Sequence, residues 1–111
     1  MFTDCEEIEV DVKTLDSLGM PSPQLLKIDT QGAECAILEG GSATLRDTRY
    51  IIMEVVERGV VYNLDSPTHD EVLAFMESIG FVKDKFINEI SFEGNRVQSD
   101  WLFKRKDSVY A

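Results

Sequence analysis

The 111-residue sequence has few residues that build metal centres and no long apolar run. Its two cysteines, Cys5 and Cys35, lie far apart without a CxxC pair, and it has a single histidine, His69. A zinc site therefore lacks a ligand set, and both cysteines are expected to be free thiols. No apolar run approaches the roughly 20 residues that cross a bilayer, and the N-terminus lacks the basic and apolar regions of a signal peptide. We expect a cytoplasmic protein without a metal.

Basic residues are also scarce, because 11 lysines and arginines stand against 21 acidic residues and the net charge is −10. Nucleic acids and anionic membranes are bound by basic surfaces that neutralise phosphates, so neither is an expected partner. The seven glycines contain no G-x-G, which is the spacing of dinucleotide-binding turns. A hydrophobic content of 43% is nevertheless sufficient for a core, and the length fits one small domain or part of a larger one.

Apolar periodicity predicts a domain that alternates strands and helices. Acidic and apolar residues alternate over 7–12, which indicates a strand with one buried face. A short helix over 14–18 follows, with Thr14 as its N-cap, and the apolar run at 25–29 predicts a second strand. A helix then begins at Gly32.

The second half of the chain has clearer signals. Its predicted elements are a strand at 50–56, a helix from a Thr68-x-x-Glu71 capping box to Gly80, and strands at 81–87 and 101–104 that form a hairpin with its turn at 93–95. The run at 50–56 is apolar almost throughout, as in strands covered by helices on both faces. Together these elements predict an α/β fold with a mostly parallel sheet and an antiparallel terminal hairpin.

Acidic side chains mark a candidate site. Asp29, Gln31 and Glu34 follow the strand at 25–29, and open α/β sheets bind ligands at the carboxyl ends of their strands. Such residues are also ordinary turn and cap residues, so a purely structural interpretation stays open. Glu54 interrupts the apolar run at 50–56. It must lie at the exposed end of its strand or have a partner, because burying a lone carboxylate is costly.

Several motifs occur together in one order. They are Val12-Lys-Thr-Leu-Asp-Ser-Leu18, Leu26-Lys-Ile-Asp-Thr-Gln-Gly-Ala-Glu34, Leu38-Glu-Gly40, Ile52-Met-Glu-Val55, Gly80-Phe81 and Asp100-Trp-Leu-Phe103. This series resembles the C-terminal half of the FkbM family of S-adenosylmethionine-dependent methyltransferases. The resemblance implies the class I, Rossmann-like methyltransferase sheet, with the strands at 25–29, 50–56, 81–87 and 101–104 as its fourth to seventh.

The resemblance covers about residues 8–106, and the family's cofactor half has no counterpart in it. That half carries a glycine-rich turn after the first strand and an acidic residue for the ribose after the second. Residues 1–111 are thus expected to form the C-terminal portion of a methyltransferase domain and to be inactive alone. The alternative is a non-catalytic scaffold or protein-interaction module derived from a methyltransferase.

The resemblance also implies which residues carry the chemistry. The expected reaction is methylation of a hydroxyl on a small molecule, glycan or polyketide, with S-adenosylmethionine as the cofactor. Asp29 and Glu54 are then the catalytic candidates, and Asp29, Gln31 and Gly32 the cofactor-binding candidates. Asp29 is expected to orient the acceptor hydroxyl rather than deprotonate it fully, because the ordinary pKa of an aspartate is about 4. Glu34 is expected to act as a helix N-terminal charge.

Other roles are open to several further residues. Asp29, Glu54 and Asp65 could hold a divalent cation through oxygen ligands, although their spacing does not demand it. His69 is expected to be solvated rather than catalytic, while Trp101 and Phe103 are expected in the core. The first strand of the class I sheet has no counterpart here, so the strand at 25–29 is expected to be an open edge through which the chain could form a homodimer.

Overall fold

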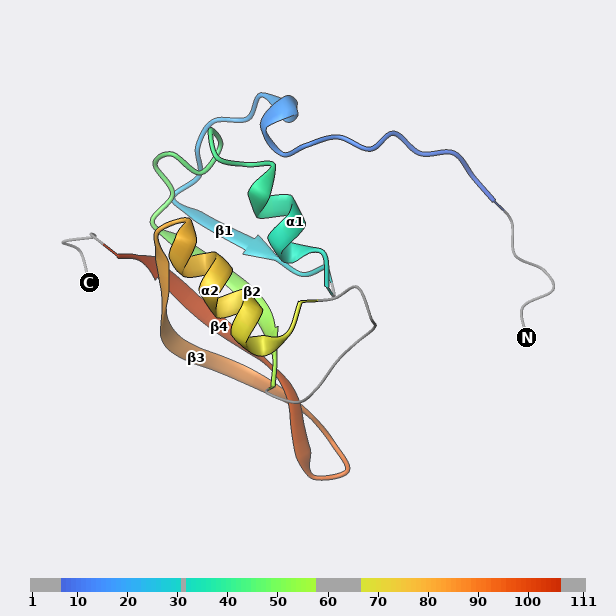
Figure 1. Cartoon of the computed structure of the whole chain (residues 1–111), viewed down its shortest axis with the longest axis vertical. Coiled ribbons are helices and arrows are strands. Elements are labelled where there is room, and N and C mark those ends of the chain that lie inside the picture. The colour runs from blue at the N-terminus through green and yellow to red at the C-terminus, as the bar shows by residue number, and fades with distance from the viewer. Residues whose placement is uncertain (1–6, 31, 58–66, 107–111) are drawn as a thin grey trace.

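The computed structural model of the chain describes residues 7–30, 32–57 and 67–106. In chain order, its elements are the 3-10 turn η1 (Asp16–Leu18), β1 (Leu25–Ile28), α1 (Glu34–Glu39), β2 (Tyr50–Val56), α2 (His69–Ser78), β3 (Phe81–Phe92) and β4 (Asn95–Arg105). Four strands form one sheet, and α1 and α2 cover one of its faces (Figure 1). The described residues thus form a small α/β domain, as the sequence predicts. None of their helices is long and apolar enough to span a bilayer.

The sheet is mixed, with the strand order β1-β2-β4-β3. β1 and β2 are parallel, whereas β4 runs antiparallel to both β2 and β3. The prediction of a mostly parallel sheet is therefore wrong for the four described strands. The reason lies in the hairpin: β4 returns from β3 and inserts between β3 and β2, so that its antiparallel pairings outnumber the single parallel one. β1 lies at the edge of the sheet, as predicted.

Residues 7–12 are not a strand. This segment extends away from the domain (Figure 1), and its apolar side chains are exposed by 78% at Ile8, 71% at Val10 and 93% at Val12. A segment in which acidic and apolar residues alternate forms a strand only where a neighbouring strand pairs with its backbone N–H and C=O groups. No strand of the described residues lies beside this segment, so the prediction fails for want of a partner.

The short helix predicted at 14–18 is a single 3-10 turn that is fastened to the loop after α1. The Thr14 hydroxyl accepts a hydrogen bond from the Ser17 N–H at 3.2 Å, but the N-cap residue of η1 is Leu15, so the predicted N-cap is wrong by one residue. The Asp16 carboxylate accepts the N–H groups of Ala43 and Thr44 at 3.1 and 2.7 Å and the Thr44 hydroxyl at 2.8 Å. These bonds lower the pKa of Asp16. Gly41 permits the close approach, because a Cβ there would lie 2.7 Å from a methyl carbon of Leu15.

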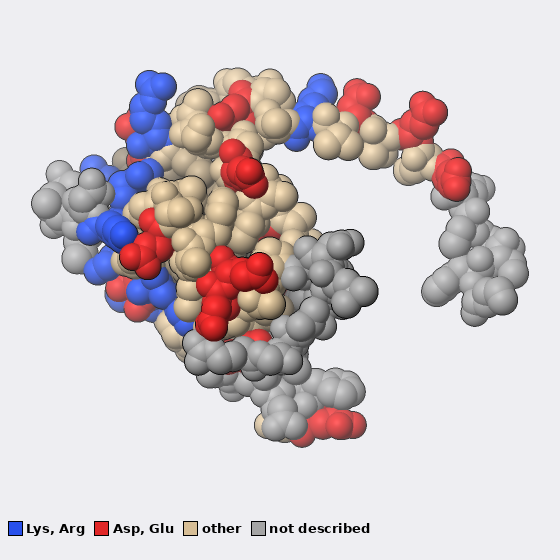
Figure 2. Space-filling view, in the orientation of Figure 1, with Lys and Arg blue, Asp and Glu red and all other residues tan. Residues whose placement is uncertain are grey.

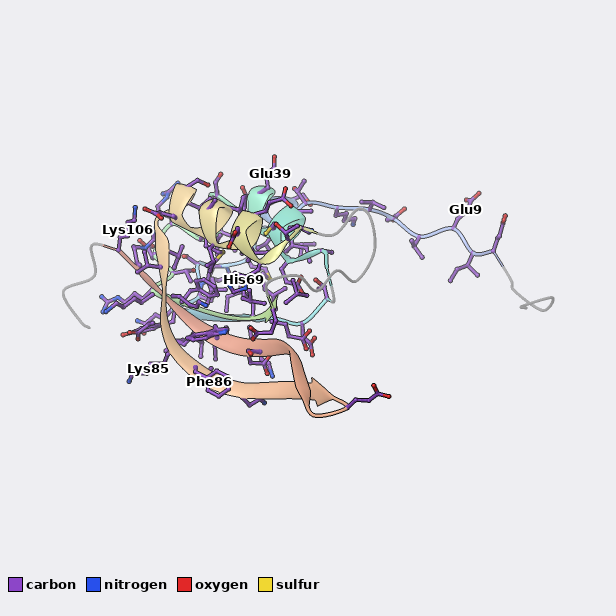
Figure 3. All side chains as sticks on the ribbon, turned by 60° about the horizontal axis from the view of Figure 1, so that its bottom comes forward. Glu9, Glu39, His69, Lys85, Phe86 and Lys106 are labelled. Atoms are coloured by element: carbon purple, nitrogen blue, oxygen red, sulfur yellow. The ribbon has the colours of Figure 1, made fainter. Side chains whose placement is uncertain are left out.

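The core lies between the two α-helices and the sheet. Its buried residues are Ile28, Leu38, Leu45, Ile51, Met53, Val55, Val72, Met76, Phe81 and Phe103. Trp101 packs against this cluster, so the prediction that Trp101 and Phe103 belong to the core is confirmed. Along β2, half-buried and buried side chains alternate from Tyr50 to Val55, and Val56 is buried as well. The prediction that helices cover both faces of β2 is wrong for the described residues, because α1 and α2 lie on the same side (Figure 3).

α2 begins as its sequence predicts. Thr68 and Glu71 form the reciprocal capping box, and Gly80 follows the C-cap residue with a φ of 92°. The hairpin turn also lies where it was predicted, with positive φ angles of 53° at Glu93 and 80° at Gly94, as a two-residue type I′ turn requires. Both hairpin strands are longer than predicted. Register shifts between Lys83 and Lys85 and further along β3 break its alternation, so its full length is not readable from period-two patterning.

Candidate active site

The turn between β1 and α1 is held by Glu34. This residue is 6% exposed, and its carboxylate accepts the N–H of Thr30 at 3.0 Å and the N–H of Gly32 at 2.9 Å. Gly32 has a φ of 117°, which side-chain-bearing residues rarely adopt. Glu34 lies in the first turn of α1, as expected, but it does more than complement the helix dipole. It folds back on the turn and fixes the backbone that follows Asp29.

Asp29 and Glu54 meet at the carboxyl ends of β1 and β2. Ile28 pairs with Met53 in the parallel register, so the next residues of the two strands, Asp29 and Glu54, are neighbours. Asp29 is exposed and Glu54 is half-buried, and Asp29 is close enough to raise the pKa of Glu54. The two catalytic candidates are therefore brought together, as the strand-end argument implies.

The pKa of Glu54 is raised to about 7. Burial is the largest cause, and the negative charges of Asp29, Asp100 and Glu34 add to it. Atom Oε2 of Glu54 is buried and has no hydrogen-bond partner among the described residues. A half-buried carboxyl group among other carboxylates takes up a proton more readily than an exposed one. Near neutral pH, Glu54 can therefore both hold a proton and release it.

Asp100 is a member of this site that the sequence analysis missed. It pairs with Glu54 across β2 and β4, and its charge contributes to the raised pKa of Glu54. The only available signal was its place at the start of the Asp100-Trp-Leu-Phe103 motif. That signal gave no reason to place Asp100 beside Glu54. The two residues become neighbours only because β4 inserts antiparallel beside β2.

His69 is not simply solvated, so that prediction is corrected. Its ring is half-buried, and Nδ1 donates a hydrogen bond to the Val56 carbonyl at 2.8 Å. The histidine thus ties the first turn of α2 to the end of β2 (Figure 3). Nearby, the hydroxyl of the buried Ser99 donates to Glu57 at 2.9 Å. Both contacts use polar side chains to fasten the carboxyl end of β2.

Other sequence-predicted residues contribute less to the described site. Gln31 and Asp65 lie outside the described residues, so the cofactor contact of the first and the metal contact of the second stay predictions. The N–H of Gly32 donates to Glu34, its φ of 117° allows the turn, and its cofactor contact stays a prediction. Within residues 7–30, 32–57 and 67–106, no group of three or more histidine, cysteine or acidic side chains has the geometry of a metal site.

Comparison with protein-family models connects this site to a known class. Residues 3–83 match the methyltransferase FkbM domain. The chain belongs to the FkbM family. The match includes β1, α1, β2 and α2, and so contains Asp29, Glu34 and Glu54, whereas Asp100 lies beyond it. FkbM membership implies a Rossmann-like methyltransferase fold and S-adenosylmethionine-dependent methylation. Neither the curated proteins nor the solved structures contain a match to the chain.

Proposed function

We propose that this FkbM chain forms the acceptor side of an S-adenosylmethionine-dependent methyltransferase that methylates a hydroxyl group. The observation that carries the proposal is the Asp29–Glu54 pair, which lies at the carboxyl ends of two parallel strands and contains one carboxyl group with a pKa of about 7. Ligands of open α/β sheets bind at such strand ends. Perturbed carboxyl groups in such a place are candidates for proton transfer.

The described residues fit the positively charged end of the cofactor. S-adenosylmethionine, when bound, supplies a methyl group on a sulfur that carries a positive charge. Asp29, Glu54 and Asp100 provide negative charge at one place, and the unpartnered Oε2 of Glu54 is an acceptor that this charge would complement. These residues would attract the sulfonium end. The described contacts offer nothing comparable for the ribose or the methionine carboxylate.

The two carboxyl groups have different tasks in this proposal. Methyl transfer to a hydroxyl needs the oxygen to be aligned with the methyl group, and the exposed Asp29 can accept a hydrogen bond from the hydroxyl and orient it. The hydroxyl then loses its proton. Glu54 is the better acceptor for this proton, because the efficiency of a general base rises as its pKa approaches the working pH. Its raised pKa thus makes up for the weak basicity expected of Asp29.

The same charges restrict the acceptor. An acceptor that carries phosphate or carboxylate near its reactive hydroxyl would be repelled by Asp29, Glu54 and Asp100. A neutral polyol or a hydroxyl compound with a cationic group would not be. We therefore place the acceptor among neutral or cationic hydroxyl compounds, which includes glycans and polyketides.

Labelled methyl transfer tests this function. The 111-residue chain should give no saturable heat with S-adenosylmethionine at millimolar concentration, since exposed charge attraction amounts to about 1 kcal/mol or less and rigid-body costs of association exceed it. The chain joined to the cofactor-binding half of another FkbM protein should transfer label to a neutral polyol. If that chimera folds and binds the cofactor but Asp29→Asn and Glu54→Gln leave its rate unchanged, the proposed roles are wrong.

A further inference from the structure

A cavity of about 280 Å³ lies where α1 and α2 end, beside the start of β3 and the end of β4. Strand register places it at the amino end of β2, because its lining residues Phe81 and Arg105 pair with each other and the neighbouring Lys104 pairs with Tyr50. Glu54 lies four residues further along β2, which corresponds to roughly 13 Å. The cavity is therefore separate from the candidate active site.

Most of the residues that line this cavity are apolar. They are Leu38, Leu45, Phe75, Ile79 and Phe81. Leu38, Leu45 and Phe81 belong to the core cluster, and the other two pack against it. Ligand pockets in proteins are mostly apolar and commonly have volumes of about 300 to 1,000 Å³, so this cavity suits a small molecule. The apolar part of such a molecule would contact the core directly.

Arg105 lines the same cavity and is held in place by the fold. Its Nε and Nη2 atoms donate hydrogen bonds to the carbonyls of Thr48 and Leu45 at 2.8 and 2.6 Å, and its guanidinium group lies 4.6 Å from the centre of the Phe81 ring. A guanidinium group has five N–H donors. The two bonds leave the other three donors without a partner among the described residues, and a ligand that accepts from them needs little further ordering of the side chain.

Arg46 supplies a second guanidinium group to the cavity. Its side chain is exposed, and it has no hydrogen-bond or ionic partner within the part of the chain that the structure describes. Glu39 also lines the cavity, so two positive charges stand against one negative charge. Figure 2 shows that lysines and arginines gather at the side of the molecule where α2 and β4 end. In a chain with a net charge of −10, this side is the one that suits an anion.

The helix ends beside the cavity do not cancel this preference. A helix C-terminus carries unpaired carbonyls and a partial negative charge, but the carbonyls at these two ends are bonded. Those of Ala36 and Leu38 accept N–H groups from the turn after α1. Those of Phe75, Met76 and Glu77 accept N–H groups from the turn after α2. The polar groups that remain for a ligand are therefore mainly the donors of the two arginines.

We propose that this cavity binds a small carboxylate with an apolar body, such as an aromatic or short aliphatic acid. The apolar body contacts Phe75, Ile79 and Phe81, and the carboxylate accepts hydrogen bonds from Arg105 and Arg46. A guanidinium group suits this task because its fork of donors matches the two oxygens of a carboxylate. The site does not depend on methyl transfer, since it shares no residue with the Asp29–Glu54 pair.

NMR titration of the 111-residue chain with phenylacetate near neutral pH tests the site. The amide signals of Leu45, Ile79 and Phe81 should shift and saturate, while that of Glu54 should not move. Phenylacetamide has nearly the same shape without the charge, and it should bind at least about tenfold more weakly, because charge-assisted hydrogen bonds to arginine are the strong ones. Equal binding of the two compounds, shifts that never saturate, or shifts centred on Glu54 would overturn the proposal.

A matched pair of variants separates the site from the general charge of the molecule. Arg46→Gln should weaken phenylacetate binding by about tenfold and leave phenylacetamide binding unchanged. Lys85→Gln removes the same charge from an exposed position on β3 that does not line the cavity, and it should bind phenylacetate as the native chain does.

Thermal unfolding provides a second readout for both variants. Phenylacetate should raise the melting temperature of the native chain, because the cavity exists only in the folded state, and the rise should be smaller for Arg46→Gln than for Lys85→Gln. Without ligand, the three melting temperatures should agree, since both replaced side chains are exposed. An equal loss of binding in the two variants, or no loss in Arg46→Gln, would contradict the proposed site.

Discussion

Asp29 and Glu54 are neighbours at the ends of two adjacent parallel strands, and the negative charge of Asp29 helps to raise the pKa of Glu54. Neither group obtains this neighbour from local sequence, because the two residues belong to different strands and meet only through the register of β1 and β2. Glu34 fixes the backbone turn that follows Asp29. The pair is therefore positioned by the sheet on one side and by the α1 turn on the other.

Glu54 should make the stability of the fold fall as the pH rises. Its pKa in the folded chain is about 7, above its ordinary value of 4.5. The folded state thus holds this proton more tightly than the unfolded state, and the contribution is fully present below about pH 4.5 and lost as the pH rises through about 7. Chemical unfolding at a series of pH values should show this decline in the native chain. Glu54→Gln should remove it, whereas Glu39→Gln, at an exposed position, should retain it.

Asp29→Asn should lower the pKa of Glu54, because it removes the largest charge contribution to the shift and leaves burial as the main cause. Carbon-13 NMR titration of the glutamate carboxyl groups measures this directly in the 111-residue chain. In a chimera that binds the cofactor, the same change should reduce methyl transfer by about tenfold or more, as expected for loss of a positioned acid–base group. Asp47→Asn is the control, since Asp47 is exposed and lies in the loop before β2. If the pKa of Glu54 is the same in the variant, the charge of Asp29 does not act on Glu54 and the proposed pair is wrong.

Glu34→Ala should destabilise the domain, because it leaves the N–H groups of Thr30 and Gly32 without their acceptor. An unsatisfied, partly buried donor costs about 1 to 3 kcal/mol. Denaturant unfolding should show a lower midpoint for this variant. Glu39→Ala, at the other end of α1 and exposed, should be close to neutral. Equal effects of the two changes would mean that the hydrogen bonds to Thr30 and Gly32 do not explain the loss.

Asp16→Ala should detach the 3-10 turn from the loop after α1. It removes three hydrogen bonds to Ala43 and Thr44. Amide hydrogen exchange at these two residues should become faster while exchange in β2 and β4 is unchanged. Because the pKa of Asp16 is lowered in the folded chain, the native protein should lose the same attachment as the pH falls through that pKa. Asp11→Ala, in the extended segment 7–12, should not change exchange at either site.

Elements with complete local signals were predictable from the sequence. The capping box of Thr68 and Glu71, the Gly80 terminus and the Glu93–Gly94 turn each carry their own stereochemical requirement, and each is found where predicted. β1 and β2 could be predicted because their apolar runs are bounded by turn residues or polar positions.

Features that depend on distant partners were not predictable. The alternation at 7–12 has the local signature of a strand, but no described strand pairs with it. The length of β3 was hidden by register shifts. In the candidate site, Asp29 and Glu54 could be found as polar residues at strand ends. Asp100 could not, because only the pairing of β4 with β2 brings it there.

The position of β4 inside the sheet has a consequence for how the chain folds during synthesis. β4 is the last described strand to leave the ribosome, yet it supplies the pairing for both β2 and β3. Its final residue, Arg105, donates hydrogen bonds to the carbonyls of Thr48 and Leu45. Until this segment emerges, one edge of β2 and both edges of β3 are unpaired in the nascent chain, and such edges are open to aggregation. We expect ribosome-bound chains that stop before β4 to be held by chaperones and to be protease-sensitive, with protection arising in one step once Arg105 is free.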